Sequence, residues 1–166
     1  MLSFKFQDLS RDWPQKLQSS NWLWIWNADK IPPHIGMSVG KEYFSLTYRE
    51  VERKLTSSMI TKAKRSQIPL LLLRLPLVID PLTVQQVFSG FDKAVVGGPT
   101  CLHPIKELLG APTSVMQLAH LLAFIEAEQG TLEVFAVHLG EEFTELPKYS
   151  VDQIMKRIDE LHAAKR

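Results

Sequence analysis

The sequence predicts an α+β fold in which an antiparallel sheet containing a hairpin packs against helices. Two strand patterns separated by a short turn come early, within residues 34–48. Later in the chain, single strands alternate with helices without a strict strand–helix–strand rhythm, which favours α+β over a doubly wound sheet. The 166 residues match one ordinary domain. Because no repeat or long linker divides them, we expect a single domain over 1–166.

The first strands follow from alternating patterns. In residues 21–26 tryptophans alternate with leucine and isoleucine, so both faces of this strand are apolar. Two prolines then break the chain, and strands are predicted over 34–39 and 42–48. Between them, Gly40-Lys41 suits a two-residue type II′ turn, which has glycine at its first central position.

The other elements follow from helical spacing, capping residues and stop signals. Asp80 before Pro81 is a typical helix start, because aspartate caps well and proline fits the first helical position. Ser150 and Gln153 form a capping box for the last helix. The remaining predicted elements are a surface helix at 11–19, an amphipathic helix at 49–65, a central strand at 69–75 covered on both faces, helices at 81–89, 101–109 and 114–129 (capped by Thr113 or Ser114), and a strand at 132–139.

Composition excludes several kinds of partner and cofactor. The formal net charge is +1, so no basic patch for nucleic acid is expected. The single cysteine, Cys101, allows no internal disulfide or zinc–thiolate site, and the five histidines lack close metal-ligand spacing. Gly97-Gly98-Pro99 is too short for a phosphate-binding loop. We therefore expect no metal and no cofactor.

The lengths of the apolar runs and the composition of the first residues indicate where in the cell the protein is expected. The longest apolar run, residues 69–73, is much shorter than a membrane span. The first residues, MLSFKFQDLSRDW, show neither an apolar secretion segment nor a cleavage signature. The expected location is the cytoplasm, with no membrane span.

Cys101 is the candidate nucleophile. If Thr100 caps the helix, Cys101 is its first residue, and the partial positive charge at the helix end should lower the thiol pKa. Pro104 is compatible, since a proline without an N–H fits a first turn. In a competing placement His103 is the cap, which leaves Cys101 just outside the helix. A buried structural cysteine is the alternative interpretation of this residue.

His34 is the candidate general base. Counting back through a two-residue turn, His34 pairs with Thr47, which could orient the imidazole by a hydrogen bond. Ser45 would take that role in a different register. His103 is an alternative base, although residues two apart on a helix diverge. A thiol at a helix start, a histidine on a strand and a polar orienter together form an activated-nucleophile arrangement.

The stretch WLWIWNADKIPPHIGMSVGKEYFSLTY resembles the first half of circularly permuted papain-like proteins of the NlpC and lecithin-retinol-acyltransferase types. In those proteins an opening strand precedes a histidine strand of the form H-x-G-x-x-x-G and then a second strand. The matching positions here are His34, Gly36 and Gly40, with slightly different spacing. The resemblance implies a permuted papain-like architecture, and a bacterial source.

The second half of the resemblance lies in LLLLRLP and TCLHPIKELLG. In the family an arginine-bearing strand leads to a helix whose first residue is the nucleophilic cysteine; Arg74 and Cys101 match these positions. The resemblance implies that Cys101 attacks an acyl carbon, that His34 shuttles protons, and that the Cys101 N–H helps to hold the oxyanion. Arg74 could bind a substrate carboxylate, or pair structurally with an acid such as Asp80.

Three functions remain open at this point. The first is a thiol hydrolase or acyltransferase that acts on an amide, ester or thioester of a small molecule or peptide. The second is a non-catalytic module that binds a ligand or protein in the same cleft, with Cys101 buried and His34 displaced or the cleft blocked. The third is an interaction protein that docks a protein partner through its tryptophan-rich segment and last helix, which requires an exposed apolar patch.

Overall fold

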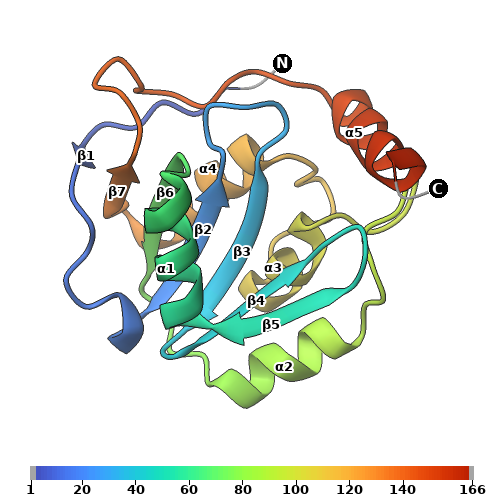
Figure 1. The fold of residues 1–166 in the computed structure, drawn as a ribbon, viewed down its shortest axis with the longest axis horizontal. Coiled ribbons are helices and arrows are strands. Elements are labelled where there is room, and N and C mark those ends of the chain that lie inside the picture. The colour runs from blue at the N-terminus through green and yellow to red at the C-terminus, as the bar shows by residue number, and fades with distance from the viewer. Residues whose placement is uncertain (1–2, 165–166) are drawn as a thin grey trace.

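The structure is a computed structural model that describes residues 3–164. A seven-stranded mixed sheet forms its centre, in the order β1-β7-β6-β2-β3-β4-β5 (Figure 1). All neighbouring strands are antiparallel except β1 and β7, which are parallel. The α+β class is therefore confirmed, and the expected antiparallel sheet is a mixed one because of this single parallel edge pair. The strands are β1 (Leu9–Ser10), β2 (Asn21–Trp26), β3 (His34–Val39), β4 (Glu42–Leu46), β5 (Val51–Leu55), β6 (Leu70–Leu75) and β7 (Val134–Val137).

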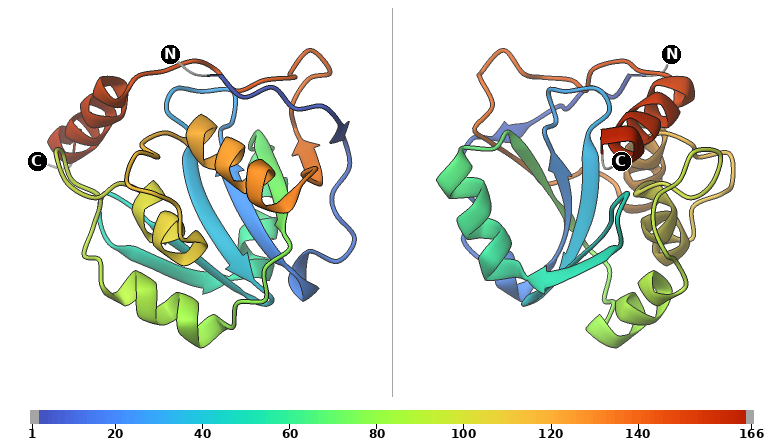
Figure 2. Two further views of the ribbon diagram at one scale, coloured as in Figure 1. Left: turned by 180° about the vertical axis from the view of Figure 1, so that it is seen from behind. Right: turned by 45° about the vertical axis from the view of Figure 1, so that its right-hand side comes forward.

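Helices cover both faces of this sheet. Helix α1 packs on one face, and α2, α3 and α4 pack on the other (Figure 2). Helix α5 lies at the margin of the molecule, beside the face that α2, α3 and α4 cover (Figure 2). It is distant in sequence from the strands of that face. The helices are α1 (Thr56–Ser66), α2 (Pro81–Ser89), α3 (Leu102–Leu109), α4 (Leu118–Gln129) and α5 (Val151–Ala164), and residues Leu17–Ser19 form one turn of 3-10 helix.

Strand β2 has the two apolar faces that its sequence predicts. Its three tryptophans join the cluster beneath α1, together with Met59 and Ala63 of that helix. Leu23 and Ile25 point the other way, into the core beneath α2, α3 and α4. Because these tryptophans are at most 5% exposed, they are core residues and offer no docking surface of the kind that the third function requires.

The hairpin and several helix ends also match the sequence. Gly40 has φ +60° whereas Lys41 is not among the residues with positive φ, as a type II′ turn requires. The side chain of Asp80 accepts a hydrogen bond from the N–H of Thr83, which caps α2. The Ser150–Gln153 capping box is present, with reciprocal bonds of 2.8 and 3.3 Å.

Several predicted elements are wrong in extent or type, including the strand predicted over 42–48, which ends at Leu46. Residues 51–55 form edge strand β5 rather than helix, because their backbone pairs with β4 while the charged side chains of VERKL face solvent at the sheet edge. Residues 11–19 contain only the single 3-10 turn. Helix α4 begins at Leu118, so neither Thr113 nor Ser114 caps it, and β7 is shorter than residues 132–139.

Candidate active site

Cys101 stands at the N-cap position of α3, directly before the first helical residue Leu102. Cys101 has helical backbone angles (φ −57°, ψ −19°). The hydroxyl of Thr100 accepts a bond from the N–H of Leu102 at 3.3 Å, and Nδ1 of His103 accepts one from the N–H of Thr100 at 2.9 Å. The bond to His103 is one half of a capping box, with histidine in the place of the usual glutamate. Helix α3 begins at Leu102, so the placement with Thr100 as cap and Cys101 as first residue is one position early, and the placement with His103 as cap is wrong.

His103 is committed to this capping role. Its Nδ1 accepts the Thr100 N–H, and burial lowers the pKa of the ring below its usual value, which keeps it neutral and able to accept. Its side chain does not line the pocket that contains Cys101. His103 is therefore not the base for Cys101, in agreement with the divergence of residues two apart on a helix.

Strands β3 and β4 separate next to the thiol of Cys101. Their ladder runs only from Val39↔Glu42 to Met37↔Phe44, so the earlier part of β3 has no partner on that side. The start of α3 contacts β3 at this opening, where the main-chain N–H of Ile35 lies near enough to the Cys101 sulfur to favour its thiolate form. The thiol therefore lies beside the peptide bond that joins His34 to Ile35.

Burial decides the protonation state of the thiol. Loss of water raises the pKa of Cys101 above its usual value, and the N–H groups of Ile35 and of Cys101 itself oppose this without reversing it. The helix start thus does not give the lowered pKa that its position alone suggests, because desolvation outweighs the dipole. The resting residue is a neutral thiol, and Cys101 as a whole is partly buried at the pocket wall.

His34 is the first residue of β3 and pairs with Trp26 of β2. Burial, and secondarily the positive charge of Lys62 on α1, lowers the pKa of His34 to about 4. A neutral imidazole has a free lone pair. Because directly paired residues share a face, the His34 side chain begins on the α1 face with Trp26, whereas α3 packs on the other face. Within residues 3–164, no side chain or main-chain group forms a hydrogen bond with its ring.

A buried tyrosine occupies the space beside the histidine strand. Tyr43 is fully buried, and its hydroxyl accepts the indole N–H of Trp26 at 2.7 Å. The same hydroxyl lies 2.1 Å from the place where a Cβ on Gly36 would stand. Glycine is therefore required two residues after His34, which gives a physical reason for the H-x-G part of the motif.

Thr47 is placed differently from the prediction. It follows the end of β4, and its hydroxyl accepts the N–H groups of Arg49 and Glu50 and donates to the carbonyl of Glu50 at 2.9 Å. These bonds close a tight turn, so the hydroxyl is used locally and does not orient His34. Ser45, the alternative orienter, is fully buried and bonds to Glu52 at 3.4 Å.

Arg74 lies outside the site. It stands on β6 opposite Trp22 and forms a half-exposed ion pair with Glu133 at 3.3 Å. It lines a different hollow, between the start of β2 and the end of α4, and not the pocket of Cys101. The proposed carboxylate-binding role beside Cys101 is therefore wrong, and the structural partner is Glu133 rather than Asp80.

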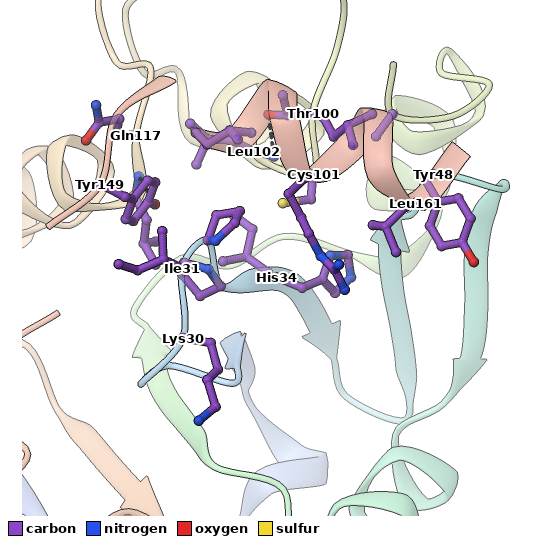
Figure 3. A pocket seen from close by; sticks show the side chains of 18 of the residues that line it. Lys30, Ile31, His34, Tyr48, Thr100, Cys101, Leu102, Gln117, Tyr149 and Leu161 are labelled. Carbon is purple, nitrogen blue, oxygen red and sulfur yellow. Dashed lines mark hydrogen bonds between the residues drawn. The ribbon is translucent and has the colours of Figure 1, made fainter. Parts of the chain in front are cut away.

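Cys101 and His34 line one pocket of about 550 Å³, which is a usual size for a small-molecule site. Figure 3 shows both side chains with Leu161 of α5 around the same space. Sequence reasoning missed the C-terminal part of this wall, because nothing in a helix pattern tells which cleft the helix borders. The missed residues include Gln117, Tyr149, Ile154, Arg157 and Glu160.

The last helix is held against the pocket by three specific contacts. His162 bonds the carbonyl of Ala94 at 3.0 Å and packs edge-on against the ring of Tyr48, and the N–H of Gly97 approaches the Met155 sulfur at 3.1 Å. Ile158 is its one buried residue within the described part of the chain. Thus α5 forms a wall of the pocket without blocking it.

No protein-family model, curated protein or solved structure matches this chain. Among residues 3–164, no helix has both the length and the apolar character needed to cross a bilayer.

Proposed function

We propose that the protein is a thiol hydrolase or acyltransferase that uses Cys101 as nucleophile and His34 as general base on an amide, ester or thioester, within a circularly permuted papain-like fold. The observation that carries the proposal is the position of the Cys101 sulfur beside the His34–Ile35 peptide, at an open pocket whose lining includes both residues. The chain order, with the histidine strand before the cysteine helix, is the order that the family resemblance implies.

The neutral state of both groups defines the first step. The Cys101 sulfur attacks the acyl carbon while its proton passes to His34, and the carbonyl electrons move to the oxygen. The Cys101 N–H, which is not used in the capping box, and the positive end of α3 stabilise that oxyanion. Collapse of the intermediate expels the leaving group with the proton from His34 and leaves a thioester.

The second step releases the acyl group. Water attacks the thioester while His34 takes its proton, and the thiol is regenerated with a carboxylic acid as product. An alcohol or amine in the place of water would give acyl transfer instead. The lowered pKa of His34 keeps the imidazole neutral over most of the pH range, so its lone pair is free in both steps, and it also makes the imidazole a weaker base than an ordinary histidine.

A direct test is the turnover of chromogenic esters, thioesters and anilides by the wild type and by Cys101→Ala and His34→Ala. We expect loss of turnover in Cys101→Ala and a decrease of about a hundredfold or more in kcat/KM in His34→Ala. His120→Gln, which changes a histidine outside the pocket, is the matched control. Turnover that survives Cys101→Ala would refute the proposal.

The competing function is non-catalytic binding in the same pocket. Two observations favour it: within residues 3–164 the His34 ring has no hydrogen-bonding partner to orient it, since Thr47 is used in its own turn, and burial raises the pKa of the Cys101 thiol. One observation opposes it, because the pocket that Cys101 and His34 line is open. Ligand binding with no turnover of any substrate in the panel would favour binding alone.

A further inference from the structure

The C-terminal helix brings one cation to the pocket. Ile154, Arg157, Ile158 and Leu161 all line it and follow one another at helical spacings of three and four residues, so they share one face of α5. Arg157 is the cation that α5 contributes to the pocket, and Glu160 of the same helix lines it too. The guanidinium thus borders the same space as the apolar side chains.

Arg157 has only a weak internal partner. Its guanidinium lies 3.7 Å from the Glu160 carboxylate, three residues along the same helix, and both side chains are about half exposed (53% and 51%). Exposed pairs of this kind contribute little and are easily exchanged. Within the described residues no other acid pairs with Arg157, so its forked donor set is available to a ligand.

The other lining residues fit an apolar segment with one negative group. Ile31 and Met116 line the pocket and are exposed by 44% and 55%, and both are large apolar side chains. Glu160 is the sole acid among the lining residues of 3–164. Lys30 is the second cation, but Figure 3 shows its side chain extending away from Cys101.

We propose that Arg157 is the anion-binding residue of this site, and that the acyl substrate carries an anionic group, a carboxylate or a phosphate, beside an apolar segment. This inference rests on the proposed function only where it calls the ligand a substrate. The preference for anions does not itself require turnover. Arginine suits both anions because its planar donors match their paired oxygens. Charge complementarity of this kind selects among substrates of equal apolar size.

The test uses Cys101→Ala, which keeps the pocket and cannot turn over, in calorimetric titrations with octanoate, octyl phosphate and octanol. We expect at least one anion to bind about tenfold more tightly than octanol, as one charge-assisted hydrogen-bond pair provides. The two anions distinguish a carboxylate site from a phosphate site. Equal affinity for octanol and both anions, or no binding of any probe, would overturn the inference.

Three further variants in the Cys101→Ala background assign the preference to one residue. Arg157→Gln should abolish it, whereas Lys156→Gln removes the same charge from an exposed neighbour that does not line the pocket and should retain it. Glu160→Gln frees the guanidinium and should strengthen anion binding. A preference that survives Arg157→Gln, or that Lys156→Gln abolishes equally, would contradict the assignment to Arg157.

Failure of the inference and failure of the proposed function give different results. If the anion preference is present but the wild type turns over no ester, thioester or anilide, the site binds anions without acyl chemistry. If thiol-dependent turnover is present but anions and octanol bind alike, the chemistry stands and Arg157 has no such role.

Discussion

The main-chain N–H of Ile35 faces the Cys101 sulfur, which places the thiol next to the peptide bond that follows His34. This contact forms where the ladder between β3 and β4 ends at Met37↔Phe44 and leaves the first part of β3 open. The sheet opening, rather than the helix alone, therefore determines which group lies near the Cys101 sulfur.

The Cys101 thiol should have a higher pKa than the thiol of a free cysteine. Burial raises its pKa, so the rate of alkylation by iodoacetamide should increase with an inflection above about 8.5, the value of an unperturbed thiol. The same protein unfolded in urea should give the ordinary inflection, which serves as the internal control. An inflection well below 8.5 in the folded protein would show that the helix start and His34 outweigh burial.

Stability should decrease in mild acid because of His34. The pKa of His34 falls from 6.5 in the unfolded chain to about 4 in the folded protein. Between pH 6.5 and pH 4 the unfolded state therefore binds a proton at His34 and the folded state does not. The free energy of unfolding should therefore be constant above pH 6.5 and fall by roughly 3 kcal/mol as the pH decreases to 4. Urea unfolding of the wild type and of His34→Gln measures this, and the variant should show a smaller decrease. An identical pH dependence in both would place the effect elsewhere.

Gly36→Ala should destabilise the protein. The new Cβ would stand 2.1 Å from the hydroxyl of the buried Tyr43, so the ring must move away from the indole N–H of Trp26. We expect a loss of about 1–3 kcal/mol in the free energy of unfolding, typical of overpacking. Gly90→Ala is the control, since its φ is −77° and its Cβ would meet only the Val87 carbonyl at 3.3 Å. Equal stability of the two variants would argue against a fixed Tyr43.

Thr100→Ala should weaken the start of α3. It removes the acceptor for the Leu102 N–H, and loss of a helix cap costs about 1 kcal/mol. Thr100→Ser keeps the hydroxyl and should retain most of the stability. Differential scanning calorimetry compares the two, and a Thr100→Ala protein as stable as Thr100→Ser would show that the capping bond contributes nothing.

Elements fixed by local chemistry were predictable. The tryptophan strand, the Gly40-Lys41 turn and the Asp80 cap each follow from side-chain pattern or backbone preference within a few residues. Residues 51–55 were not predictable in this way, because VERKL fits a helical pattern and becomes a strand only by pairing with β4. The parallel pairing of β1 with β7 is equally non-local, since it joins residues more than a hundred positions apart.

The site was predictable only in part for the same reason. Cys101 and His34 could be chosen from their local settings, and the structure places both in one pocket. The prediction that Thr47 orients His34 assumed that the pairing of the hairpin strands continues past Met37↔Phe44, where the strands separate. Arg74 was assigned by resemblance, but the fold puts it beside Glu133. Arg157 carries no local signal, because its importance comes only from where α5 packs.

The most direct test of the central claim is intact-protein mass spectrometry after brief exposure to 4-nitrophenyl octanoate. We expect the wild type to carry one octanoyl group on Cys101, Cys101→Ala to carry none, and His34→Ala to form the adduct about a hundredfold more slowly or worse. An adduct that forms equally fast with and without His34, or one found on another residue, would contradict a Cys101–His34 catalytic pair.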